Sequence, residues 1–90
     1  HNNTQFTYDY KNSENKYLYI KIQTDQSYDN YSNLINNDYS KIINSHQTYY
    51  YIESNKNRLL WYDNNIIFSI ISYEPVDELI KISQNIKNNI

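Results

Sequence analysis

Hydrophobic and polar residues alternate along most of the chain, which predicts β-strands, because successive side chains of a strand point to opposite faces. The alternation is clearest over residues 17–24, where Leu18, Ile20 and Ile22 share one face. Similar stretches occupy residues 6–10, 39–43 and 46–53, and a hairpin occupies residues 58–73. The pattern therefore predicts an antiparallel sheet.

The hairpin has its turn within Asp63-Asn64-Asn65. A two-residue loop pairs odd positions with even ones, which places Leu59 and Trp61 on the same face as Ile66, Phe68 and Ile70. A three-residue loop would reverse this arrangement.

The hydrophobic period changes after residue 73, where Val76, Leu79, Ile82, Ile86 and Ile90 recur at steps of three and four. This spacing predicts an amphipathic helix. Pro75 suits its first turn, and Asp77 and Lys81 are spaced for an i,i+4 ion pair of about 0.2–0.5 kcal/mol. By contrast, residues 25–38 are polar and irregular, and we expect a loop there with one helical turn.

Together these segments predict an α+β fold, with an antiparallel sheet of about five strands and a C-terminal α-helix packed across one face. The expected structural core is Leu59, Trp61, Phe68, Ile70, Leu79, Ile82 and Ile86. We expect residues 1–90 to form a single domain that is a fragment of a longer protein, since no Met opens the chain.

The composition excludes several classes of site. The chain has 16 Asn, 14 Ile and 12 Tyr but no Gly and no Cys, so it has no disulfide, no Cys-based zinc site and no Gly-rich phosphate loop. Its residues favour A/T-rich codons, which indicates a very A/T-rich genome, such as that of a low-GC Gram-positive bacterium, and Asn replaces Gly at the expected turns. The net charge is −2 without a basic stripe, which argues against a nucleic-acid partner.

Candidate catalytic and metal-ligating residues are few. His1 is terminal, and His46 begins a predicted strand without the spacing of a zinc site. Asp25, Asp29 and Asp38 lack the spacing and the Gly of an EF-hand and are read as solvated loop acids. We therefore expect no enzymatic activity, no cofactor and no metal.

Tyrosine is the unusual surplus, and it predicts a partner-binding sheet face opposite the C-terminal helix. The residues expected on that face are Tyr17, Tyr19, Tyr49, Tyr51 and Tyr62. An aromatic, partly apolar face suits a sugar, a peptide or another domain. The alternative is that coding bias supplies the tyrosines and that their rings only cover the sheet.

Residues 43–90 resemble a known bacterial family. The resemblance rests on four segments, which are Asn44-Ser45-His46-Gln47 before a Tyr-rich strand, Leu59-Leu60-Trp61-Tyr62-Asp63-Asn64-Asn65, Phe68-Ser69-Ile70 and Asp77-Glu78-Leu79-Ile80-Lys81-Ile82. They are similar to the LxW hairpin and EELxxIA helix of uncharacterised extracytoplasmic domains of Clostridia and Bacilli. Ser45, Asn65 and Ser83 depart from the Gly or Ala usual in that pattern.

The resemblance implies a domain of a membrane-anchored protein, such as an anti-sigma-factor-like regulator or a lipoprotein. We therefore expect a non-enzymatic sensing or interaction domain on the extracytoplasmic face of the membrane of a low-GC Gram-positive bacterium, with the anchor outside these residues and a protein, apolar or peptide ligand as partner.

Two alternatives remain open. A lipid or apolar ligand carrier would have a cavity lined by Leu59, Trp61, Phe68, Leu79 and Ile82. A small inhibitor or immunity-type protein would use an acidic, Tyr-rich surface against a basic partner.

Overall fold

The computed structural model describes the backbone of residues 5–11, 17–36, 38–44 and 46–88, and the side chains of residues 17–36, 38–44 and 46–86. The elements in chain order are β1 (Gln5–Lys11), β2 (Tyr17–Gln23), α1 (Tyr28–Ile35), β3 (Ser40–Asn44), β4 (Gln47–Glu53), β5 (Asn57–Asp63), β6 (Ile66–Ser72) and α2 (Val76–Asn88). Neither helix of this described part is long and apolar enough to cross a membrane.

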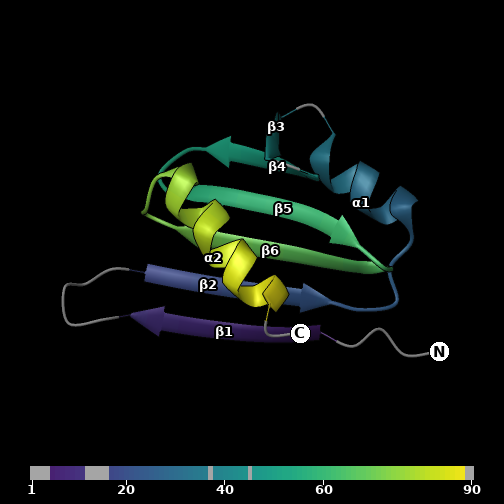
Figure 1. The fold of residues 1–90 in the computed structure, drawn as a ribbon, viewed down its shortest axis with the longest axis horizontal. Helices are drawn as coiled ribbons and strands as arrows, with labels where there is room; N and C mark the ends of the chain where they lie inside the picture. The colour runs from purple at the N-terminus through teal and green to yellow at the C-terminus, as the bar shows by residue number, and fades with distance from the viewer. Residues whose placement is uncertain (1–4, 12–16, 37, 45, 89–90) are drawn as a thin grey trace.

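The strands form one antiparallel sheet in the order β1-β2-β6-β5-β4-β3 (Figure 1). The predicted α+β architecture is confirmed, and the sheet has six strands where about five were expected. Since β2 and β3 are not neighbours, the chain must pass from one side of the sheet to the far edge between them. The segment that contains α1 makes this crossing.

The β5–β6 hairpin sets which residues face the core. Its loop is Asn64-Asn65, and both residues have positive φ, of 51° and 64°. Asn tolerates this left-handed backbone better than most residues with a side chain, so the turn forms without Gly. Trp61 consequently pairs with Phe68, as the two-residue loop predicts, and their rings stack with centroids 4.7 Å apart.

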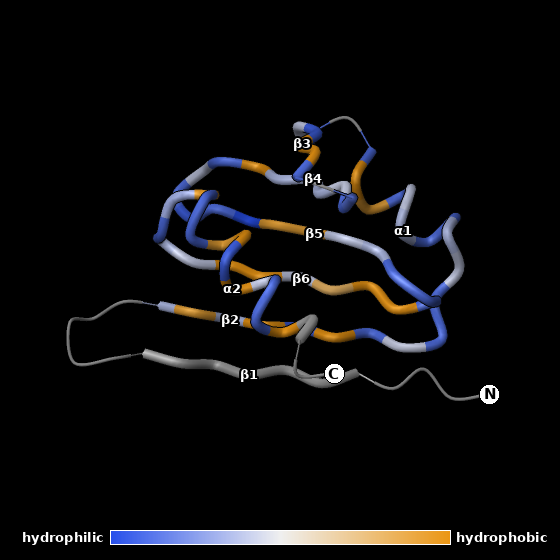
Figure 2. The backbone as a smooth tube through the Cα atoms, viewed as in Figure 1, coloured by the Kyte–Doolittle hydropathy of each residue, from blue (hydrophilic) through white to orange (hydrophobic). Residues whose placement is uncertain are grey.

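Helix α2 crosses one face of the sheet, in front of β5 and β6 in Figure 1. The core under it has the predicted members: Leu59, Trp61, Phe68, Ile70 and Leu79 are buried, and Ile82 and Ile86 pack against them half-buried. Figure 2 shows the most hydrophobic stretches on the central strands, where this layer meets the sheet. The helix therefore covers the face predicted for it.

The first turn of α2 differs in one detail from the prediction. Pro75 lies directly before α2, and its carbonyl accepts hydrogen bonds from the N–H groups of Glu78 and Leu79. A proline is tolerated there because the N–H groups at the start of a helix have no partner within the helix. The ion pair that forms joins Lys81 Nζ to Glu78 Oε1 at 3.2 Å, at i,i+3 spacing. The expected partner of Lys81 was Asp77, and that pairing is wrong.

Residues 25–38, expected to be a loop with one turn, contain the eight-residue helix α1. Ser27 caps it, because its hydroxyl accepts a hydrogen bond from the N–H of Asn30. Tyr31 and Ile35, one helical turn apart, are the buried residues of α1 and pack on Leu60 and Ile67 of the sheet. The helix forms because this sheet face supplies an apolar surface that the segment's own polar sequence does not reveal.

Candidate binding surface

The predicted tyrosine face divides between the two faces of the sheet. Tyr17, Tyr19 and Tyr62 lie on the α1 face, as expected. Tyr49 and Tyr51 lie on the α2 face, where Tyr49 is buried and Tyr51 packs against the same core as Trp61. Their predicted placement opposite the C-terminal helix is wrong.

The length of the β4–β5 loop explains this error. Strand β4 ends at Glu53 and β5 begins at Asn57, so three residues connect them and Tyr51 pairs with Leu59. Directly paired residues lie on the same face of a sheet. Tyr49 and Tyr51 therefore join Leu59, and Tyr50 takes their place on the α1 face.

Tyr49 has a structural role under α2. Its hydroxyl and that of Ser83 are 2.9 Å apart, and Ser83 Oγ is also 2.6 Å from the carbonyl oxygen of Ile80. Because the carbonyl can only accept, Ser83 donates to Ile80 and Tyr49 donates to Ser83. This chain of hydrogen bonds ties strand β4 to the buried side of the helix, and it gives a purpose to the Ser that departs from the usual Ala.

Four tyrosines meet where α1 covers the sheet, and we call Tyr28, Tyr31, Tyr50 and Tyr62 the tyrosine cluster. The Tyr31 and Tyr62 rings stack with centroids 5.4 Å apart, and Tyr50 meets the edge of Tyr31 at 6.0 Å. Burial, followed by the neighbouring Tyr50 and Tyr28, raises the pKa of Tyr31 well above its usual value. The hydroxyl of Tyr62 donates a hydrogen bond to the carbonyl oxygen of Gln26 at 2.9 Å, which holds the segment before α1 against β5.

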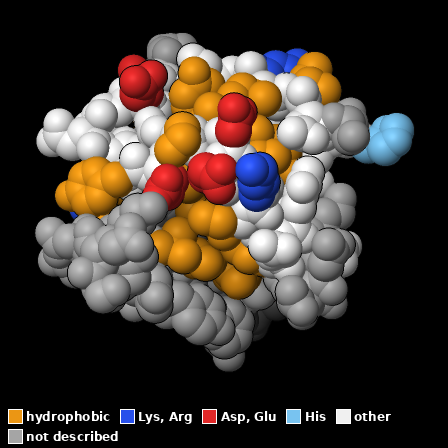
Figure 3. All heavy atoms as spheres, turned by 60° about the vertical axis from the view of Figure 1, so that its left-hand side comes forward, with side chains coloured by type: hydrophobic (Ala, Val, Ile, Leu, Met, Phe, Trp, Pro, Cys, Tyr) orange, Lys and Arg blue, Asp and Glu red, His pale blue; other side chains and the backbone are white. Residues whose placement is uncertain are grey.

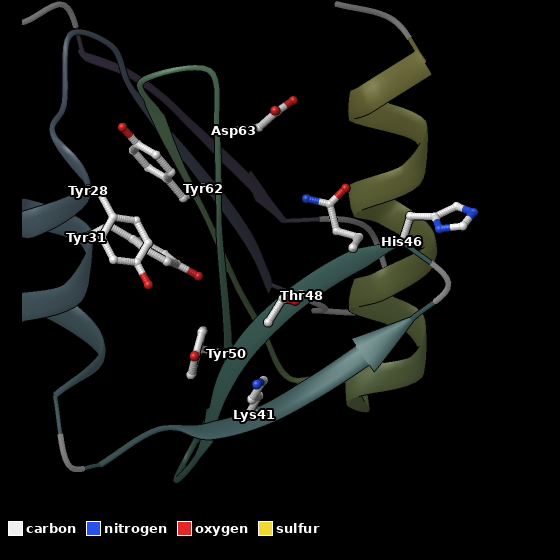
Figure 4. Close-up of a pocket in the computed structure, with 9 residues that line it drawn as sticks. Tyr28, Tyr31, Lys41, His46, Thr48, Tyr50, Tyr62 and Asp63 are labelled. Carbon is white, nitrogen blue, oxygen red and sulfur yellow. The ribbon is translucent and has the colours of Figure 1, made fainter.

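A hollow of about 470 Å³ opens beside the tyrosine cluster (Figure 4). Lys41, His46, Thr48 and Asp63 complete its rim, together with Gln47. In Figure 4 the His46 ring points away from the tyrosines, so it would not contact a ligand bound against them. Within the described residues no group of three or more His, Cys, Asp or Glu side chains is arranged to hold a metal ion.

The rest of the α1 face is not covered by α1, and two more hollows lie there. One of about 260 Å³ and one of about 450 Å³ share Tyr19, Arg58 and Ile71. Lys21 lines the first, while Tyr17 and Lys56 line the second. We call these two joined hollows the basic groove.

Aromatic rings hold one cation of the basic groove in place. Lys56 Nζ lies 4.1 Å from the centroid of the Tyr17 ring and 5.6 Å from that of Tyr73, and the two rings meet edge to face. Such contacts contribute about 0.5–1 kcal/mol each at exposed sites. The positions of Lys56, Arg58 and Lys21 in this groove were not predicted.

Comparison with known proteins adds a family but no function. A family model described as a domain of unknown function (DUF4367) matches residues 1–86. No curated protein and no solved structure matches the chain. The family match includes the N-terminal half, which lies outside the segments that carry the sequence resemblance.

Proposed function

The chain belongs to the DUF4367 family, and from this premise we propose that it is a non-enzymatic interaction domain, borne on the extracytoplasmic side of the membrane by a membrane-anchored bacterial protein. The observation that carries the proposal is the part of the α1 face that α1 leaves uncovered. Tyr17 and Tyr19 there are half-buried, and Tyr73 beside them is 57% exposed. Amphipathic rings held at such a surface are typical of binding sites.

The extracytoplasmic placement is supported by the resemblance of the hairpin and helix motifs. The residues that carry it have consistent positions in the fold, since Leu59, Trp61, Phe68 and Leu79 together make the core under α2. A motif made of core residues defines a fold and does not define a reaction. It therefore supports a shared domain architecture and assigns no catalytic residue.

The ligand-carrier alternative needs a cavity between the sheet and α2. The residues expected to line it are buried or half-buried against one another, with Leu59 and Leu79 fully buried. None of the three hollows described above includes any of these residues. The packing of this layer favours the interaction domain over the carrier.

The inhibitor alternative was expected to use an acidic surface against a basic partner. The tyrosine-lined groove instead presents Lys21, Lys56 and Arg58. A basic partner would be repelled there, so this alternative loses its charge complementarity.

The proposal is tested with the full-length gene product in its own cells. A photo-crosslinking residue replaces Asn55, which lines the groove without being one of its cations, or, as the matched control, Lys81 on the exposed side of α2. We expect adducts from position 55 and none from position 81, and we expect protease added to intact cells to remove the domain. Protection of the domain until the cells are lysed would contradict the placement, and equal adducts from both positions would contradict the binding face.

A further inference from the structure

The basic groove has a regular geometry set by strand pairing. Tyr19 pairs with Ile71 across β2 and β6, and Ile71 pairs with Arg58 across β6 and β5. These three residues therefore form one row across the sheet, with Tyr19 and Arg58 about 10 Å apart at two strand spacings. The next row, two residues along each strand, begins with Lys21 paired to Ser69.

The row positions fix how far apart the cations are. Lys21 and Arg58 are separated by two strands and one two-residue step, which places their Cα atoms about 12 Å apart. An extended peptide repeats every second residue at about 7 Å, so side chains at i and i+4 on one side are about 13 Å apart. Two carboxylates at that spacing match the two cations.

Among the residues whose side chains the structure describes, the charged residues that line the groove are Lys21, Lys56 and Arg58, with no Asp or Glu. No ion pair joins Lys21 or Arg58 to a carboxylate of the described residues. The chain as a whole has net charge −2, and α2 carries Asp77 and Glu78 in its first turn. Figure 3 shows acidic side chains gathered among apolar ones on the side of the molecule that it presents.

An anionic ligand would therefore be attracted to the groove while the protein's net charge opposes its binding elsewhere. The positive groove on a chain of negative net charge therefore favours binding of an anionic ligand at the groove and disfavours its binding elsewhere on the surface.

Apolar and aromatic residues line the groove beside these cations, namely Tyr17, Tyr19, Ile52 and Ile71. A polyphosphate or another plain polyanion would satisfy the charges and leave these residues uncovered. A peptide with acidic and apolar side chains would satisfy both. We propose that the basic groove binds an acidic, partly apolar peptide segment of a partner protein in extended form. This inference rests on the proposed interaction role and names the chemistry of its partner.

The test measures binding of a fluorescein-labelled twelve-residue peptide of Glu, Leu and Ser to the purified domain by fluorescence anisotropy. We expect saturable binding at 50 mM NaCl that weakens steadily as salt is added, because partly exposed ion pairs are screened. We expect the double variant Lys21→Glu with Arg58→Glu to weaken binding by about tenfold or more, since each reversal replaces an attraction by a repulsion.

Lys81→Glu makes the same charge change as either one of these two reversals, but outside the groove, and should change the affinity by less than about twofold. The same peptide with Lys in place of Glu should not bind. Far-UV circular dichroism and Trp61 fluorescence establish that each variant is folded, and a charge-conserving Arg58→Lys variant should retain most of the binding.

Three results would overturn the inference: no binding of the acidic peptide to the wild type, equal weakening by Lys81→Glu, or binding of inorganic polyphosphate in preference to the peptide. If these occur while cross-linking from position 55 persists in cells, the interaction role stands and the acidic-peptide partner is wrong. If the cross-linking also fails, both are wrong.

Discussion

Replacement of Trp61 by Ala is the strongest perturbation of the core that this structure offers. Trp61 is 2% exposed, its ring stacks on Phe68 with centroids 4.7 Å apart, and it meets Tyr49 edge to face at 5.8 Å. Removal of a buried aromatic side chain costs about 3–5 kcal/mol, from lost burial and from the cavity that remains. Small domains have a total stability of about 5–15 kcal/mol, so the variant should lose between about a fifth of its stability and nearly all of it.

The loss is measured by urea unfolding followed by far-UV circular dichroism, since Trp61 is the chain's one Trp and its fluorescence disappears in the variant. Ile43→Ala is the matched control, because Ile43 lies on edge strand β3 and is 66% exposed. We expect the control to lose less than about 1 kcal/mol. If Trp61→Ala does not fold, the smaller change Trp61→Phe gives the same ordering. A loss below about 1 kcal/mol for Trp61→Ala would refute the assignment of this face to the core.

Three further predictions concern Tyr49, Asn65 and Tyr31. Tyr49→Phe removes the hydroxyl that donates to Ser83 and should lower the free energy of unfolding by about 0.5–1.5 kcal/mol in the same urea assay, whereas no loss would show that the pair does not tie β4 to α2. Asn65→Gly should be neutral or slightly stabilising in thermal melts, while Asn65→Val should be destabilised by about 1–3 kcal/mol because a β-branched residue resists positive φ; equal melting temperatures would contradict the turn geometry. The pKa of Tyr31 is higher in the folded protein than in the unfolded chain. The free energy of unfolding should therefore be unaffected by this group below about pH 10, where both forms are protonated, and should fall as the pH rises from there towards the folded pKa. Alkaline urea midpoints of the wild type and Tyr31→Phe test this, and an identical pH dependence in the two proteins would contradict it.

Much of the architecture follows from local pattern. The alternation in residues 58–73 fixes the β5–β6 register once the loop length is known, and Asn64 and Asn65 tolerate the positive φ of the two-residue turn that forms. The steps of three and four after Pro75 specify α2 and its apolar side. These elements carry their determinants within their own sequence.

Helix α1 does not carry its determinants within its own sequence, because its stability depends on residues far away in the chain. Its buried side consists of Tyr31 and Ile35, and both are anchored by Leu60 and Ile67 from β5 and β6. The Ser27 cap was the one local sign that could have extended the predicted single turn into a helix.

The faces of Tyr49 and Tyr51 could have been predicted. The pairing rule used for the β5–β6 hairpin gives the observed faces when applied to the three-residue loop before β5. The basic groove is different, since Lys21 and Arg58 come from strands that are not neighbours and meet only through the order β2-β6-β5. Non-local strand order of this kind has no signature in the alternation of either strand.

The central claim is that the α1 face binds a partner through the basic groove, and the most direct test is a nuclear magnetic resonance titration of the ¹⁵N-labelled domain with the acidic peptide. The structure predicts amide shift changes concentrated around Tyr19, Arg58 and Ile71, with those of α2 unchanged. Changes centred on α2, or changes that persist in the Lys21→Glu, Arg58→Glu variant, would contradict it.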